Sequence, residues 1–107
     1  MDIQLAISKA KLPDLYATED VPTEEKLICL HFVFGNCHWF AAEYDNEDTF
    51  FGYAILNGDF SNAEWGYFSL QELLEISIGN FTVQLDTSWQ MTPAKDIELI
   101  KLSGGIF

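Results

Sequence analysis

The chain has 107 residues, of which 49% are hydrophobic and 15% aromatic, and its formal net charge at neutral pH is −12. This length suits one domain with one core, and the apolar content is too high for a disordered acidic tail. Arginine is absent, and no lysine occurs between Lys26 and Lys95. Such a one-signed charge repels nucleic acid, anionic lipid and phosphorylated metabolites, and it attracts basic protein surfaces.

The first quarter of the sequence predicts one short helix and a long polar connection. Residues 3–10 suit a helix that Asp2 caps and that ends at Leu12-Pro13, because the residue before a proline disfavours helical backbone. Residues 14–26 are polar and acidic and should cross the surface as a loop. The N-terminus lacks the basic segment of a signal peptide, and no run of about 18 apolar residues is present, so we expect a cytoplasmic protein.

Two apolar runs predict a tight β-hairpin. Residues 27–34 and 38–44 are rich in strand formers, and Gly35-Asn36 between them tolerates the backbone of a two-residue turn. Alternation then places one set of side chains on the face that we expect to form the core: Ile28, Leu30, Phe32, Phe34, Cys37, Trp39 and Ala41. The opposite face should carry Cys29, His31, Val33, His38, Phe40, Ala42 and Tyr44.

Three further strands are predicted in the second half of the chain. Residues 49–56 and 64–68 favour strands on either side of a turn that begins at residues 57–59. Apolar and polar residues alternate over residues 81–86, which is typical of a half-buried strand.

Two helices complete the predicted fold. Ser69 and Glu72 form a capping box that opens a helix ending near Gly79-Asn80. Thr92-Pro93 should begin the last helix, which Gly104-Gly105 ends. We expect a single α+β domain over residues 1–107, with a curved, mainly antiparallel sheet of about five strands and two or three short helices.

The predicted hairpin contains four residues of metal-binding type: Cys29, His31, Cys37 and His38. A structural zinc site needs four such ligands to converge on one point. The predicted register sends Cys37 to the face opposite Cys29 and His31. We therefore expect free thiols, no disulfide and no metal site.

Paired carboxylates are a second possible source of chemistry, as in glycoside hydrolysis. The acids in question are Glu43, Asp45, Asp59 and Glu64. With so few cations, little can orient a charged substrate or stabilise an oxyanion. The acids of residues 43–48 also lack the ligand spacing and central glycine of a calcium-binding loop. We expect a protein that is not an enzyme and uses no cofactor, with a small hydrolase as the least favoured alternative.

The residues that we expect to bind a partner are the acids of the cation-free segment and the aromatic rings near them. They are Glu43, Asp45, Glu47, Asp48, Asp59 and Glu64, with Tyr44, Phe60 and Trp65 as anchors. Aromatic pairs adjacent in sequence should make both faces of the sheet partly apolar. Helices should cover one face, and the other should form a groove or interface bearing Tyr44 and Tyr53.

Several segments resemble a bacterial family of unknown function, the DUF2958 proteins. They are Leu12-Pro13-Asp14-Leu15-Tyr16-Ala17-Thr18-Glu19, Phe50-Phe51-Gly52, Trp65-Gly66-Tyr67-Phe68-Ser69-Leu70-Gln71-Glu72-Leu73, the strand from Trp39 to Glu43, and Asp86 with Thr92-Pro93. The resemblance spans nearly the whole chain and implies no assigned activity. It implies a context, since such proteins are often carried on plasmids, phages and other mobile elements. This chain departs from a generic member in its shortage of basic residues.

Together these observations favour a non-enzymatic acidic protein-binding domain of a mobile element. Its carboxylates would take the place of phosphates on a basic surface of a host protein, as in an anti-restriction or anti-CRISPR nucleic-acid mimic. The alternative is an accessory protein-interaction module whose acidity serves only solubility. Neither reading includes direct nucleic-acid or membrane binding.

Overall fold

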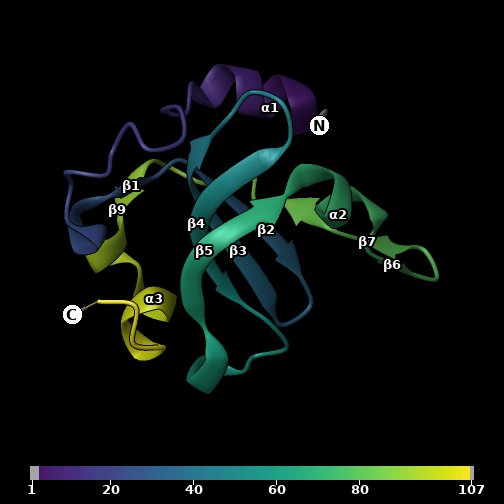
Figure 1. Cartoon of the computed structure of the whole chain (residues 1–107). Helices are drawn as coiled ribbons and strands as arrows, with labels where there is room; N and C mark the ends of the chain where they lie inside the picture. Colours follow the sequence, from purple (N-terminus) through teal and green to yellow (C-terminus); the bar gives the residue numbers. More distant parts are fainter. Residues whose placement is uncertain (1–2, 107) are drawn as a thin grey trace.

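A five-stranded antiparallel sheet forms the centre of the protein, in the order β5-β4-β3-β2-β8 (Figure 1). The computed structural model describes residues 3–106, so the predicted cap Asp2 lies outside the described residues. The strands of the sheet are β2 (Leu30–Phe34), β3 (Cys37–Tyr44), β4 (Thr49–Ile55), β5 (Glu64–Ser69) and β8 (Gln84–Leu85). The predicted α+β class, with a mainly antiparallel sheet of five strands, is confirmed.

Short helices and two small β-ladders surround this sheet. The α-helices are α1 (Ile3–Ala10), α2 (Leu70–Glu75) and α3 (Glu98–Leu102), and the 3-10 helices are η1 (Thr23–Glu25), η2 (Phe60–Asn62) and η3 (Ala94–Asp96). The ladders join β1 (Leu27–Ile28) to β9 (Thr92–Pro93), and β6 (Ser77–Ile78) to β7 (Phe81–Thr82). Within residues 3–106, no helix combines the length and apolar composition that a membrane crossing requires.

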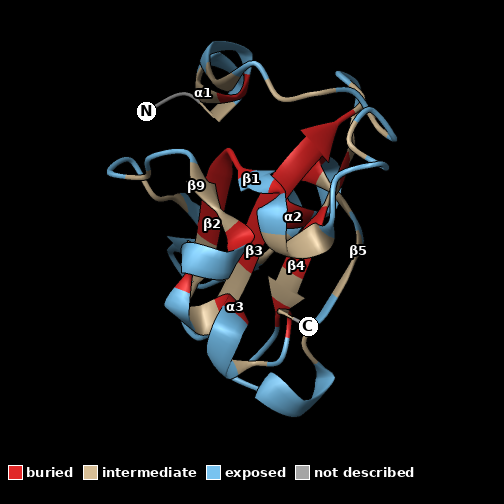
Figure 2. Cartoon of the chain, turned by 90° about the vertical axis from the view of Figure 1, so that its left-hand side faces the viewer, coloured by how far each residue is buried: buried red, intermediate tan, exposed pale blue. Residues whose placement is uncertain are grey.

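The sheet has a core on each face, and its central strands are the most deeply buried part of the chain (Figure 2). The first core packs against α1 and α2 and contains Ile7, Leu30, Phe32, Trp39, Ala41, Tyr44, Phe50, Leu70, Leu73 and Val83. The second core packs against η3 and α3 and contains Ile28, Phe40, Ala42, Tyr53, Ile55, Ala94, Ile97 and Ile100. The expected open groove bearing Tyr44 and Tyr53 is therefore wrong, because both rings are buried.

The predicted hairpin is confirmed, but two of its residues face the other way. β2 and β3 pair around the two-residue turn Gly35-Asn36, and Gly35 has the positive φ that this turn requires. Ile28 packs in the second core, because the strand is interrupted at Cys29 and β1 pairs with β9 instead. Tyr44 packs in the first core.

A β-bulge in β3 explains the position of Tyr44. Ala41 lies opposite Gly52, but Glu43 lies opposite Phe51, so β3 contains one extra residue at this point. Beyond the bulge the alternation of side chains is inverted. Tyr44 turns into the first core, and Glu43 turns toward the face on which residues 13–26 lie.

The helices of the second half are shorter than predicted. Ser69 caps α2 as expected, since its hydroxyl accepts a hydrogen bond from the Glu72 amide. However, α2 ends at Glu75, and Gly79-Asn80 forms the turn of the β6–β7 hairpin instead. Only the β8 part of the predicted fifth strand joins the sheet, and β9 with η3 precedes the last helix.

Candidate functional site

Glu43 was expected to contact a partner, but it is only 3% exposed. Its carboxylate accepts hydrogen bonds from the amides of Tyr16 at 2.9 Å and Thr18 at 3.1 Å, and from the Thr18 hydroxyl. A carboxylate accepts hydrogen bonds at only about four lone-pair sites, so these donors occupy most of its capacity. The prediction of an outward-facing Glu43 is wrong, and the residue instead fixes the loop 13–19 to the sheet.

Lys26 completes this buried polar cluster and is 6% exposed. Its ammonium donates to the carbonyl of Thr18 at 2.5 Å and to the Thr18 hydroxyl at 2.8 Å, and it lies 4.0 Å from the Glu43 carboxylate. Phe51 stacks beneath the ammonium, with 5.8 Å between the nitrogen and the ring centre. One of the five lysines is therefore buried and adds almost no positive charge to the surface.

Segments that carry the family resemblance meet around the same point. Tyr16 of the first segment contacts Tyr67 of the third, with ring centres 6.4 Å apart. Tyr67 also packs against Phe51 of the second segment. Gly52 beside it is required by packing, because a Cβ there would lie 1.8 Å from the Phe40 carbonyl oxygen. These segments therefore build one corner of the fold around Glu43.

Asp45 and Asp48 shape the turn between β3 and β4 and the start of α2. Asp45 accepts hydrogen bonds from the backbone amides of residues 47, 48 and 49, which hold the pKa of its carboxyl below the usual value. Asp48 accepts from the Ser69 hydroxyl at 2.5 Å and from the Gln71 amide at 2.8 Å. Both acids therefore form hydrogen bonds within the fold, whereas Glu47 between them is exposed.

Asp59, Phe60, Glu64 and Trp65 lie at the other end of β5. Asp59 caps η2 through the amide of Ser61, and Phe60 and Glu64 are exposed. The indole of Trp65 donates to the carbonyl of Gly105 at 3.0 Å, so this ring is partly covered by the C-terminal segment. β5 spans about 17 Å at the usual rise per residue. The six predicted acids are therefore divided between two ends of the sheet and do not form one patch.

Tyr44 cannot be an exposed anchor, because it is 4% exposed and stacks on Phe50 with 4.4 Å between ring centres. Burial, followed by the charges of Asp45, Asp48 and Glu47, raises the pKa of its phenol above the usual value. The bulge in β3 turns this ring inward.

The distribution of positive charge is very uneven. Lys95 pairs with Glu25 at 3.0 Å, and Lys101 pairs with Glu98 at 3.3 Å. Lys9 and Lys11 are exposed at the end of α1. Carboxylates, in contrast, are exposed on several loops and on β5, α2 and η3: Asp14, Glu19, Asp20, Glu47, Asp59, Glu64, Glu72, Glu75 and Asp96. Away from α1 and the two pairs, the ionic surface of residues 3–106 is negative.

The histidines of the hairpin form a hydrogen-bonded chain. His31 Nδ1 lies 3.0 Å from Asp86, and His31 Nε2 lies 2.9 Å from His38 Nδ1. Both rings stack with Phe40. The hydrogen bond from His31, followed by one from Ser88, lowers the pKa of the Asp86 carboxyl. Burial, followed by the charge of His31, lowers the pKa of the His38 ring.

The cysteines do not join this chain. Cys29 and Cys37 are free thiols, and burial raises the pKa of Cys29. Cys37 packs against the first core, on the face opposite His31, as predicted. Within residues 3–106 no three His, Cys, Asp or Glu side chains are arranged to hold a metal ion.

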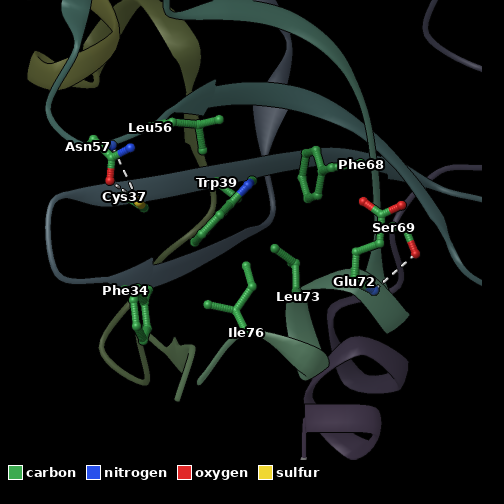
Figure 3. Close-up of a pocket in the computed structure, with 10 residues that line it drawn as sticks. All are labelled: Phe34, Cys37, Trp39, Leu56, Asn57, Phe68, Ser69, Glu72, Leu73 and Ile76. Atoms are coloured by element: carbon green, nitrogen blue, oxygen red, sulfur yellow. Dashed lines mark hydrogen bonds between the residues drawn. The ribbon is translucent and has the colours of Figure 1, made fainter. Parts of the chain in front are cut away.

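Sequence reasoning missed an apolar surface beside α2. A pocket of about 380 Å³ lies between the sheet and this helix, where the side chains of Trp39, Leu73 and Ile76 point into a common space (Figure 3). A second pocket of about 330 Å³ lies against the β6–β7 hairpin. The sequence signal was the apolar pair Ile78 and Phe81 on either side of Gly79-Asn80, which is typical of a hairpin with an exposed face.

The geometry defines an α+β domain with a buried polar cluster at one corner, a negative surface and an apolar surface beside α2. The family model described as "Protein of unknown function (DUF2958)" matches residues 9–99, and the chain belongs to this family. The predicted resemblance is confirmed. No curated protein and no solved structure matches the chain.

Proposed function

We propose that the chain is a non-enzymatic, acidic protein-binding domain that occupies a basic surface on another protein. The observation that carries this proposal is the distribution of ionic groups. Lys26 is buried and Lys95 and Lys101 are paired with acids, whereas exposed carboxylates without such a pair occur on β5, α2, η3 and several loops. Such a surface accelerates encounter with a cationic partner, and added salt slows that encounter.

The contacting acids are a subset of those expected from the sequence. Glu47 and Glu64 are exposed, and Asp59 is exposed beside Phe60. Glu43, Asp45 and Asp48 accept hydrogen bonds from backbone amides of the chain and stabilise its loops and the start of α2. Phe60 and the accessible part of Trp65 are the aromatic contacts at the η2 end of β5.

The family context suggests the class of partner. If the chain is encoded by a plasmid or phage, a cytoplasmic nuclease of the host, of the restriction or CRISPR type, offers a basic groove that normally holds nucleic acid. Carboxylates spaced over a folded surface can take the place of the phosphates in such a groove. The domain would then act as an anti-defence nucleic-acid mimic.

A salt-gradient capture experiment tests this function. The immobilised chain is exposed to an extract of its native host, and bound protein is eluted with rising salt or with duplex DNA. We expect elution by both, and loss of capture by the double variant Glu47→Lys, Glu64→Lys. The matched control is Glu19→Lys, Asp20→Lys, which makes the same change in net charge on the loop before η1.

Two results would contradict the proposal. Equal loss in both double variants would show that net charge alone is responsible. Capture that resists salt and survives both double variants would favour an accessory module with an apolar contact surface.

A further inference from the structure

The β6–β7 hairpin carries the two most exposed large apolar side chains in the described part of the chain. Phe81 is 75% exposed and Ile78 is 69% exposed, and the two residues pair across the hairpin. The hairpin projects from the sheet next to α2 (Figure 1). Leu74 of α2 is also exposed. Neighbouring exposed apolar residues of this kind mark interaction sites on folded proteins.

Two pockets adjoin this hairpin, and both are lined mainly by apolar side chains. The first lies between the sheet and α2 and includes Trp39 and Ile76. The second is lined by Ile78 and Phe81 of the hairpin itself. Phe34 lines both pockets. They are therefore neighbouring sites, and two anchor side chains of one bound segment can fill them together.

Charge restricts what can bind there. Glu72 lines the first pocket and is the one charged residue among the described residues that line the two. Glu75 is exposed one turn further along α2. A second copy of this chain, with a net charge of −12, would bring like charges together. An anionic lipid surface is repelled for the same reason. The occupant that fits is apolar at its centre and cationic at its edges.

We propose that the hairpin surface, defined by Phe34, Ile76, Ile78 and Phe81, docks a basic amphipathic segment of a partner protein. Two apolar side chains of the segment enter the two pockets, and flanking Lys or Arg side chains face Glu72 and Glu75. An amphipathic helix presents such anchors at i, i+3 and i+7. The inference rests on the proposed function for the positive charge of the partner, and it adds a defined apolar site to it.

A pair of isomeric peptides provides the test. The first is a labelled synthetic helix with leucines at i, i+3 and i+7 and lysines on both flanks, and the second has the same composition in scrambled order. Binding to the full chain is measured by fluorescence anisotropy. We expect the amphipathic peptide to bind about tenfold more tightly than the scrambled one, because both have the same charge and only the first has an apolar stripe.

Two double variants locate the site on the protein. Ile78→Ser, Phe81→Ser removes exposed side chains and should weaken binding of the amphipathic peptide about tenfold. Met91→Ser, Leu102→Ser removes exposed apolar side chains elsewhere and should leave it unchanged. Glu72→Gln, Glu75→Gln should weaken binding a few-fold and reduce its dependence on salt.

The possible failures can be distinguished from failure of the proposed function. Equal affinity for both peptides, or unchanged affinity in the Ile78→Ser, Phe81→Ser variant, would overturn the hairpin surface. If the hairpin surface were overturned in this way but Glu47→Lys, Glu64→Lys still removed capture from the host extract, the proposed function would stand without the hairpin surface. A dimer that the hairpin variant converts to a monomer in sedimentation would also overturn the inference, since the occupant would then be a second copy.

Discussion

The corner around Glu43 and the surface around the β6–β7 hairpin differ in which kind of side chain is buried and which is exposed. At the corner, a carboxylate and an ammonium are buried and hydrogen-bonded to the loop 13–19. At the hairpin, Ile78 and Phe81 are left in contact with solvent. One region uses charge to hold the fold, and the other leaves apolar area uncovered.

Net charge alone does not identify the acids that are available to a partner. Glu43 is surrounded by donors, whereas Glu47, four residues along, is exposed. The difference arises from the bulge in β3 and from the loop that passes over it.

The largest effect is expected from Glu43→Ala. The change leaves the Lys26 ammonium buried without its carboxylate and removes the acceptor for two backbone amides. Breaking a buried pair in this way typically costs about 3–5 kcal/mol of the free energy of unfolding. Urea unfolding measures the loss. Addition of Lys26→Met should restore part of it, because no uncompensated charge then remains. A loss below about 1 kcal/mol would show that the cluster is dispensable.

A smaller loss is expected from Asp48→Ala. Asp48 accepts hydrogen bonds from the Ser69 hydroxyl and the Gln71 amide at the start of α2. Removal of a helix-capping side chain costs about 0.5–2 kcal/mol. Glu47→Ala is the matched control, since the neighbouring carboxylate is exposed, and its effect should stay within about 0.5 kcal/mol. Equal effects of the two variants would contradict the capping role.

The environment of His38 should make the stability of the fold depend on pH. The pKa of the folded His38 ring lies below its usual value near 6.5, so between the two values the unfolded chain binds more protons than the folded one. Stability should therefore fall as pH drops below about 6.5. Asp86, whose folded pKa is also lowered, adds a second loss below its usual value near 3.8. Unfolding of His38→Gln across this range should show the second loss without the first. If this variant still lost stability as pH fell below about 6.5, that loss would belong to a group other than His38.

The smallest effect on stability is expected at the hairpin. Ile78→Ser, Phe81→Ser should change the free energy of unfolding by about 0.5 kcal/mol or less, because neither side chain is buried. The same variant should bind less of a hydrophobic dye. A large destabilisation would mean that these residues belong to the core, and the contrast between the two regions would fail.

Local patterns predicted most elements of the fold. The hairpin around Gly35-Asn36, the strands β4 and β5 and the capping role of Ser69 all depend on neighbours in sequence, and all are confirmed. The ends of elements were less predictable. The apolar periodicity of α2 continued past Glu75 although the backbone changed to a β-hairpin there. The change is made by the pairing of β6 with β7 and by the positive φ of Gly79 at the turn, features that outweigh the helical spacing of the apolar residues.

The roles of the acids could not be predicted for a related reason. The amides that donate to Glu43 belong to Tyr16 and Thr18, which lie 27 and 25 positions before it in the sequence. One extra residue in β3 decides that Glu43 faces this loop and that Tyr44 faces the first core. A bulge leaves no fixed signature in a run of apolar residues, so alternation alone assigns the wrong face.

The burial of Lys26 has a practical consequence for limited proteolysis. Trypsin cleaves after lysine, and the other lysines lie near the two ends of the chain, before residue 12 and after residue 94. Cleavage after Lys26 requires its ammonium to leave Thr18 and Glu43 and its carbonyl to release the Ala94 amide, so that the corner opens together with the start of β1. The rate of that single internal cut therefore reports how often this corner opens, while the rest of the protein stays folded.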